Sequence, residues 1–280
     1  MTQAADSVSP LDFVRAPTVA PSDLTRHREA FAENGYLVFR DVVSREKLSR
    51  LRDRIIEEYD RAKASGAIFS GGGQISGHLN CFPGEESRFI YGALEQQGII
   101  DLVKAISPKP LQQPNVGCNL NLPHSVVQHY HADSNYLAEF FIVNIAIVDT
   151  DLSNGAIDVL PGTHRKFYKY WRFALERPYR FTTRVPLQAG DVLIRTSNLW
   201  HRGMPNHTDV PRPMVAFTWE NGGREEDGFK RDGGKITFHP NWYRPNLLGR
   251  LRERTYVAAP FTYNAYRFVR SLVGNKGYEV

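Results

Sequence analysis

The chain has 280 residues, 41% of them hydrophobic and 23% charged, so it can bury the core of one large domain or two small ones. The formal net charge of +5 is spread along the sequence without a dense Lys or Arg cluster, which argues against a nucleic-acid-binding protein. The two cysteines, Cys81 and Cys118, form no paired framework, and we expect free thiols in a reducing, cytoplasmic compartment.

The N-terminal part of the chain predicts one strand followed by two helices. Residues 1–22 are polar, lack a secretory-signal pattern and are expected to form a loose lead-in. Residues 35–43 predict a strand, and Ser44 offers an N-cap for an amphipathic helix of about five turns. Residues 89–107 predict another helix, and the glycine-rich stretch 66–88 between the two helices predicts a long loop that acts as a lid.

From residue 115 onward the pattern changes to short apolar runs separated by turn signals, which favours a sandwich or jelly roll. Asn154-Gly155 predicts a hairpin turn, and the aromatic-rich excursion 165–180 predicts a second lid. Because no linker is visible, we expect residues 1–280 to form a single domain, with 221–280 as a C-terminal tail wrapped on it. The expected strands are 115–121, 124–131, 139–149, 156–160, 182–187, 191–196, 198–203 and 213–220.

A candidate metal site begins with the segment His131-Ala132-Asp133. Alternate residues of a strand point to the same face, so His131 and Asp133 can hold one ion together. His201, from another strand, completes a set of two imidazoles and one carboxylate, which is the ligand set of non-haem Fe(II) oxygenases. A rival trio of His129, His131 and Asp133 is less favourable, because its Cα atoms span about 13 Å along one strand.

Arg212 lies just before the apolar run 213–219 and is therefore expected at the start of a strand. Its planar guanidinium suits the two-pronged binding of a carboxylate, and a cation that becomes buried at such a place needs a partner. An iron site together with a bound dicarboxylate indicates oxidation driven by 2-oxoglutarate and O2.

Several short blocks of the sequence occur in an order that resembles the phytanoyl-CoA dioxygenase family of Fe(II)- and 2-oxoglutarate-dependent oxygenases. They cover about residues 30 to 220, and residues 221–280 show no further block that resembles this family. The blocks are Asn34-Gly35-Tyr36-Leu37-Val38, Gln128-His129-Tyr130-His131-Ala132-Asp133, residues 154–164, residues 189–193, Trp200-His201-Arg202-Gly203 and Pro211-Arg212.

This resemblance implies a mainly β fold, a double-stranded β-helix (a jelly roll of the cupin type), with N-terminal helices packed on the larger sheet. It implies that His131, Asp133 and His201 hold iron and that Arg212 pairs with the far carboxylate of 2-oxoglutarate. Asn144 and Gln128 are candidates for further cosubstrate contacts, although an Asn satisfied by its neighbours is an equal alternative at the first position. A carboxylate at position 133 favours hydroxylation over halogenation, since related halogenases have a small residue there.

The expected reaction is hydroxylation of an aliphatic C–H bond in a small polar or anionic metabolite, with release of succinate and CO2. Candidate substrate contacts are His78 and Asn80 in the first lid, and Arg172 and Tyr179 in the second. Two other classes remain open: a cupin-type metalloenzyme that does not use 2-oxoglutarate, and a small-molecule-binding barrel without activity. We expect no nucleic-acid partner and no transmembrane segment, because the apolar stretch 140–148 is too short to span a bilayer. The sequence leaves the substrate and the oligomeric state undetermined.

Overall fold

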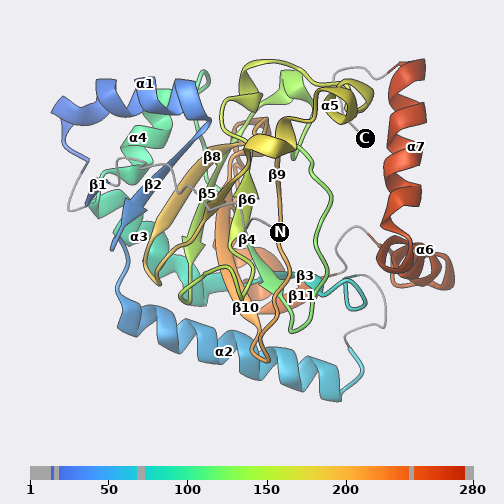
Figure 1. The fold of residues 1–280 in the computed structure, drawn as a ribbon. Coiled ribbons are helices and arrows are strands. Elements are labelled where there is room, and N and C mark those ends of the chain that lie inside the picture. The colour runs from blue at the N-terminus through green and yellow to red at the C-terminus, as the bar shows by residue number, and fades with distance from the viewer. Residues whose placement is uncertain (1–13, 16–18, 68–72, 240–242, 275–280) are drawn as a thin grey trace.

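The computed structural model describes residues 14–15, 19–67, 73–239 and 243–274 (Figure 1). It contains an eight-stranded sheet with the order β1-β2-β8-β5-β10-β4-β3-β11 and a three-stranded sheet with the order β7-β6-β9. Apart from the parallel pair β1 and β2, the paired strands are antiparallel. The strands are β1 Val14–Arg15, β2 Tyr36–Arg40, β3 His78–Phe82, β4 Asn115–Asn121, β5 Phe141–Ala146, β6 Ile157–Val159, β7 Thr183–Val185, β8 Val192–Thr196, β9 His201–Arg202, β10 Arg212–Thr218 and β11 Thr237–His239.

Helices cover the outer face of the larger sheet, and a second group lies on the other side of the molecule (Figure 1). The first group comprises α1 Leu24–Asn34, α2 Arg45–Ala64, α3 Arg88–Gln96 and α4 Ile99–Ile106, and the second comprises α5 Tyr170–Glu176, α6 Leu247–Ala258 and α7 Pro260–Val273. Short 3-10 helices lie at Pro21–Asp23, Gly84–Ser87, Tyr136–Ala138, Thr163–Arg165, Pro178–Phe181, Glu220–Gly222 and Gly228–Gly234. The expected amphipathic helix is α2, which buries its apolar stripe of Leu48, Leu51, Ile55 and Tyr59.

Side-chain alternation gives the central strands of the larger sheet two different faces. One face packs into the main core with the helices, through Val143, Ile145, Ile194, Val215 and Phe217. The intervening positions Asn144, Arg195 and Arg212 point the other way, toward the three-stranded sheet. Apolar residues of both sheets, such as Leu193 and Val159, form a second core between them. Polar groups are thus displayed inside the jelly roll on an otherwise apolar support.

Two sequence expectations about loops are wrong. The turn at Asn154-Gly155 does not close a hairpin, because β5 and β6 lie in different sheets and the turn carries the chain from one to the other. Gly155 has a φ of +91°, and an added Cβ would lie 2.6 Å from the Asn121 amide nitrogen, so glycine is required there. The stretch 66–88 is not one long loop, since β3 lies within it and pairs with β4 and β11. Its glycines bracket a short strand, and residues 68–72 lie outside the described part.

Two further elements differ from expectation. Residues 124–131 do not form a regular strand: His124 lies in a turn, 125–130 belong to no helix or strand, and His131 forms an isolated bridge with His201. The helix expected over 89–107 is split into α3 and α4 at Gly98, whose φ of +71° ends one helix and redirects the next. Apolar spacing continues on both sides of this glycine, which is why periodicity alone predicted one helix.

The expected tail 221–280 contains two helices, α6 and α7, which the sequence analysis missed. Local signals for both were present. The Asn246 side chain accepts a hydrogen bond from the backbone of Gly249 at 2.8 Å, as an N-cap does, and Pro260 stands in the first turn of α7. Within the described residues, none of the helices combines the length and apolar character that crossing a bilayer requires.

Glu253 fastens α6 to the loop that precedes β3. Its carboxylate is fully buried and accepts hydrogen bonds from the backbone of Gly73 at 3.0 Å, from the backbone of Ser76 at 2.9 Å and from the Ser76 hydroxyl at 2.7 Å. Hydrogen bonds to a charged acceptor are stronger than neutral ones, and here one side chain satisfies three donors.

We expect Glu253→Ala to lower the free energy of unfolding by about 3 kcal/mol, because it leaves buried donors without an acceptor. Urea denaturation of the variant and the parent measures this difference. Arg254→Ala is the matched control on the exposed side of α6 and should change the free energy by less than about 0.5 kcal/mol. Equal stability of both variants would show that water replaces the carboxylate.

Candidate metal centre

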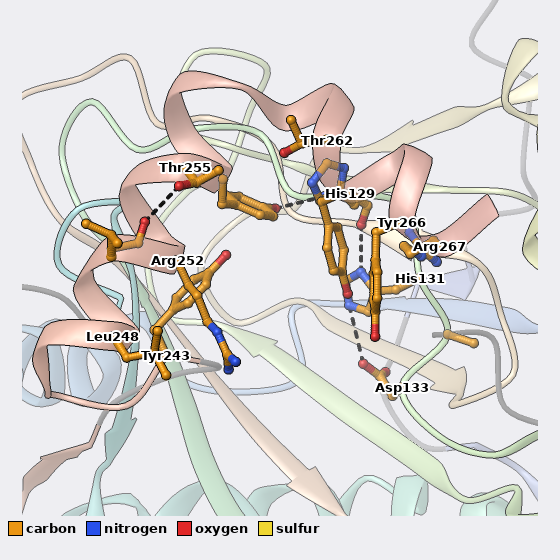
Figure 2. A pocket seen from close by; sticks show the side chains of 14 residues that line it. His129, His131, Asp133, Tyr243, Leu248, Arg252, Thr255, Thr262, Tyr266 and Arg267 are labelled. Carbon is orange, nitrogen blue, oxygen red and sulfur yellow. Dashed lines mark hydrogen bonds and ion pairs between the residues drawn. The ribbon is translucent and has the colours of Figure 1, made fainter. Parts of the chain in front are cut away.

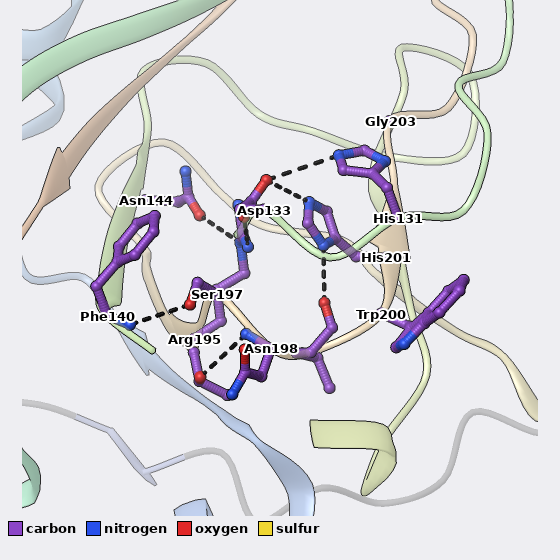
Figure 3. Close-up of polar contacts among 12 residues, drawn as sticks. His131, Asp133, Phe140, Asn144, Arg195, Ser197, Asn198, Trp200, His201 and Gly203 are labelled. Carbon is purple, nitrogen blue, oxygen red and sulfur yellow. Dashed lines mark hydrogen bonds and ion pairs between the residues drawn. The ribbon is translucent and has the colours of Figure 1, made fainter. Parts of the chain in front are cut away.

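His131, Asp133 and His201 converge because two backbone segments pair inside the jelly roll. The backbone groups of His131 and His201 exchange two hydrogen bonds, at 2.9 and 3.0 Å, and the amide of Asp133 donates to the Ser197 carbonyl at 2.9 Å. The ligand atoms of the three side chains all lie within 4.8 Å of one another. Each imidazole Nε2 lies 3.6 Å from Asp133 Oδ1 (Figure 3).

The backbone sets the orientation of both imidazoles. Nδ1 of His131 lies 2.8 Å from the His129 carbonyl, and Nδ1 of His201 lies 2.9 Å from the Leu199 carbonyl. A carbonyl only accepts, so each Nδ1 carries the hydrogen and each Nε2 presents a lone pair toward Asp133. Burial lowers the pKa of both rings, with Arg195 adding to the effect at His201, whose pKa falls to about 3. Both rings are therefore neutral at physiological pH, and each can donate the lone pair of its Nε2 to a metal ion.

Arg195 fixes the carboxylate of the cluster and was not found in the sequence analysis. Burial favours the neutral form of Asp133, but neighbouring groups, the Arg195 guanidinium foremost, hold the pKa of this carboxyl below its ordinary value. The guanidinium forms an ion pair with Asp133 Oδ2 and donates from Nε to the Asn144 side-chain oxygen at 3.2 Å. Asp133 thus turns Oδ1 toward the imidazoles. A charged residue inside the buried strand β8 was the signal available in the sequence.

The donor set suits a divalent iron ion. Two neutral imidazole nitrogens and one ionised carboxylate oxygen face a common point, and three ligands of this kind leave positions open on an octahedral ion. Each ligand is itself held by a carbonyl or a guanidinium, as is usual for metal ligands. His129 is not part of this cluster, because its ring packs against Tyr256 and Tyr263, with centroids 4.5 and 4.8 Å away.

Arg212 is a buried cation whose polar contacts are neutral. It is 5% exposed and donates to the carbonyls of Asn154 at 3.4 Å and Gly155 at 3.1 Å. Burial lowers its pKa to about 10, so it stays charged at neutral pH. Within the described residues it forms no ion pair with a carboxylate. A buried charge of this kind calls for an anionic partner from outside the chain.

The remaining candidates are placed as follows. Asn144 contacts Arg195, and the Gln128 side-chain oxygen accepts from the backbone of Gly203 at 2.9 Å. His78 is buried on β3, where Nε2 lies 2.7 Å from the Val126 carbonyl, and the nearby positive charge of Arg212 acts on it. Asn80 is half-buried on the same strand, Arg172 pairs with Glu176 on α5, and Tyr179 stacks against Tyr130.

A cavity of about 800 Å³ adjoins His131 and Asp133 (Figure 2). Among the described residues, the lining includes neither His78 and Asn80 nor Arg172 and Tyr179, the contacts expected for a substrate. Helices α6 and α7 supply most of the wall instead. Their place beside the metal cluster could not be predicted from the sequence, because the position of a C-terminal segment depends on long-range contacts. The lining residues are His129, His131, Ala132, Asp133, Tyr243, Leu248, Leu251, Arg252, Thr255, Tyr256, Thr262, Tyr263, Tyr266 and Arg267.

His78 gives the fold a pH dependence. Burial lowers its pKa from 6.5 to about 4, so between these values the unfolded chain binds a proton on this ring while the folded chain does not. The free energy of unfolding should therefore fall as the pH drops through this window. His78→Gln should make that slope shallower by about 1.4 kcal/mol per pH unit. Urea denaturation at several pH values measures it, and the exposed His207→Gln serves as a control with the parent slope.

A family model described as phytanoyl-CoA dioxygenase matches residues 31–214, which is more than half of the chain. The match confirms the family resemblance found in the sequence and, together with the His-Asp-His cluster, the iron and 2-oxoglutarate cofactor pair. The matched region ends before α6 and α7.

Solved structures of similar fold support the jelly-roll assignment. The epimerase SnoN, in complex with Fe3+, alpha ketoglutarate and nogalamycin RO, is 18% identical with a TM-score of 0.54 over 71% of this chain and 84% of SnoN. The alpha ketoglutarate dependent carbocyclase SnoK is 16% identical with a TM-score of 0.57 over 81% of this chain and 91% of SnoK. AviO1 from Streptomyces viridochromogenes is 19% identical with a TM-score of 0.54 over 72% of this chain and 96% of AviO1. At these identities the likeness establishes the fold.

Proposed function

Because this chain belongs to the phytanoyl-CoA dioxygenase family, we propose that it is an Fe(II)- and 2-oxoglutarate-dependent dioxygenase that hydroxylates an aliphatic C–H bond of a small metabolite. The observation that carries the proposal is the His131, Asp133 and His201 cluster inside a jelly roll that also buries the cation Arg212. Neither rival class accounts for a buried guanidinium without a carboxylate partner among the described residues.

Each residue has a distinct proposed task. His131, Asp133 and His201 hold the metal, which when bound supplies the activation of O2. Arg195 keeps one oxygen of Asp133 directed at the metal position and is itself braced by Asn144. Arg212 binds the far carboxylate of 2-oxoglutarate. Gln128 already accepts from Gly203, so its task is to hold the backbone beside His131.

The outcome of the reaction depends on what the pocket presents to the metal. SnoN is an epimerase and SnoK a carbocyclase, so this fold supports more than one result. Hydroxylation is favoured here because the carboxylate at Asp133 occupies the position that a halide needs in related halogenases. An incubation of purified enzyme, Fe(II) and 2-oxoglutarate with a metabolite extract under 18O2 distinguishes the outcomes. A product that gains one 18O atom supports hydroxylation, an isomer without label indicates epimerisation, and loss of two hydrogens indicates desaturation or ring closure.

Metal and cosubstrate binding can be read without a substrate. Anaerobic addition of Fe(II) and then 2-oxoglutarate should give the weak visible absorption band of the chelate. We expect His131→Ala and Asp133→Ala to abolish this band, because each removes one of three protein ligands. Arg254→Gln, on the exposed side of α6, should keep it. A band of parental strength in both ligand variants would exclude the cluster as the iron site.

Arg212→Met should raise the KM for 2-oxoglutarate by about 30-fold or more, since it removes the only charge proposed for the far carboxylate. Succinate formation without added substrate, followed over a range of 2-oxoglutarate concentrations, measures this change. Arg212→Lys keeps a charge but loses the two-pronged geometry and should fall between the parent and the methionine variant. An unchanged KM in Arg212→Met would assign the carboxylate to another group.

A further inference from the structure

The cavity beside the metal cluster is built largely by a part of the chain outside the family match. Its inner end is formed by His131 and Asp133, whereas α6 and α7 lie beyond residue 214, where the match ends. A volume of about 800 Å³ lies in the upper part of the range for small-molecule sites, which is roughly 300–1,000 Å³. The space therefore suits a substrate much larger than 2-oxoglutarate.

The wall of this cavity is mainly aromatic. Four tyrosines follow one another along it, with ring centroids 5.8 Å apart for Tyr243 and Tyr256, 6.0 Å for Tyr256 and Tyr263, and 6.2 Å for Tyr263 and Tyr266. The ring of His129 extends this row toward the metal cluster through its contacts with Tyr256 and Tyr263. Aromatic faces and edges bind flat, apolar bodies well, and tyrosine hydroxyls add hydrogen bonds to ring substituents.

The charge of the lining is positive. Asp133 is the one acidic residue among those that line the cavity, and Arg195 already pairs with it. Arg267 is buried, donates to the Tyr130 carbonyl at 2.8 Å and lies over the Tyr170 ring. Arg252 differs, because it has neither an ion pair nor a hydrogen bond in the described part of the chain. Figure 2 shows Arg252 on α6, among the residues that line the cavity.

Both helices are fixed in place without a ligand. Glu253 ties α6 to the loop before β3, and the backbone of His129 donates to the Tyr256 hydroxyl at 3.1 Å. Helix α7 is tied to α5, where the amide of Trp171 donates to the Ser271 hydroxyl at 2.9 Å. The helices that carry the tyrosine row and Arg252 are thus preformed, which lowers the entropy cost of binding.

From these observations we infer that α6 and α7 form the substrate-recognition element and that the substrate is an anion with a rigid, ring-containing apolar body. The tyrosine row holds the body against the metal cluster, and Arg252 binds the anionic group at the far end. This inference rests on the proposed function, because the ligand of this cavity is a substrate only if the metal cluster is catalytic. Binding of the ligand does not itself require turnover.

A matched pair of fluorescent probes tests the inference. 8-Anilino-1-naphthalenesulfonate and N-phenyl-1-naphthylamine share a ring body and differ by the sulfonate. Both are titrated into the full-length protein, with and without anaerobic Fe(II) and saturating 2-oxoglutarate, so that Arg212 is occupied in one arm. We expect the parent to bind the sulfonate about tenfold more tightly than the neutral probe. Arg252→Gln should remove this preference and leave the neutral probe unaffected.

Three control variants locate the binding. Tyr263→Leu should weaken both probes, whereas Arg254→Gln, also on α6, should change neither. Leu272→Ser removes an apolar side chain from the exposed face of α7 and should also change neither. Equal binding of both probes by the parent, or a loss in Arg254→Gln or Leu272→Ser as large as in Arg252→Gln, would overturn the inference. Because the probes report without turnover, a failure here is distinct from absence of the iron and 2-oxoglutarate chelate.

Discussion

The pairing of residues 131–133 with the strand that carries His201 is the constraint on which the site depends. Two backbone hydrogen bonds join His131 and His201, and a third joins Asp133 to Ser197. Carbonyls at both histidines then set the ring orientation, and Arg195 sets that of the carboxylate. None of the three ligand side chains is left to find its orientation alone, so the cluster is preorganised for a cation.

The larger sheet limits the free-energy cost of burying these polar groups, because its apolar and polar side chains lie on opposite faces. Its outer face packs apolar side chains into the core with the helices, and its inner face displays Asn144, Arg195 and Arg212. Arg195 donates to Asn144 and pairs with Asp133, so the burial of Arg195 and Asn144 is compensated by hydrogen bonds and opposite charge. Within the described part of the chain, the hydrogen-bond partners of Arg212 are carbonyls, so its charge has no carboxylate partner there. The same sheet therefore supplies the stable core, the guanidinium that braces Asp133 and the buried cation Arg212.

The residues around the metal cluster come from two portions of the chain, one inside the family match and one C-terminal to it. The family match covers the sheets that carry the metal cluster and ends before the helices that enclose the cavity. The candidate metal ligands and most of the cavity wall thus come from different segments, which meet at His129, where the ring touches Tyr256 and Tyr263.

Local patterns in the sequence were enough to predict those elements whose signals lie within a few residues of one another. The two-residue spacing of His131 and Asp133 predicted that they share one face of a strand. Helical periodicity predicted α2, and apolar runs predicted most of the jelly-roll strands. The tertiary structure alone decided which strands pair, so it showed that Asn154-Gly155 joins two sheets and that β3 lies in a stretch read as a loop. It also revealed Arg195 beside Asp133 and α6 and α7 around the cavity. These facts depend on contacts between residues far apart in the chain, and no local spacing encodes them.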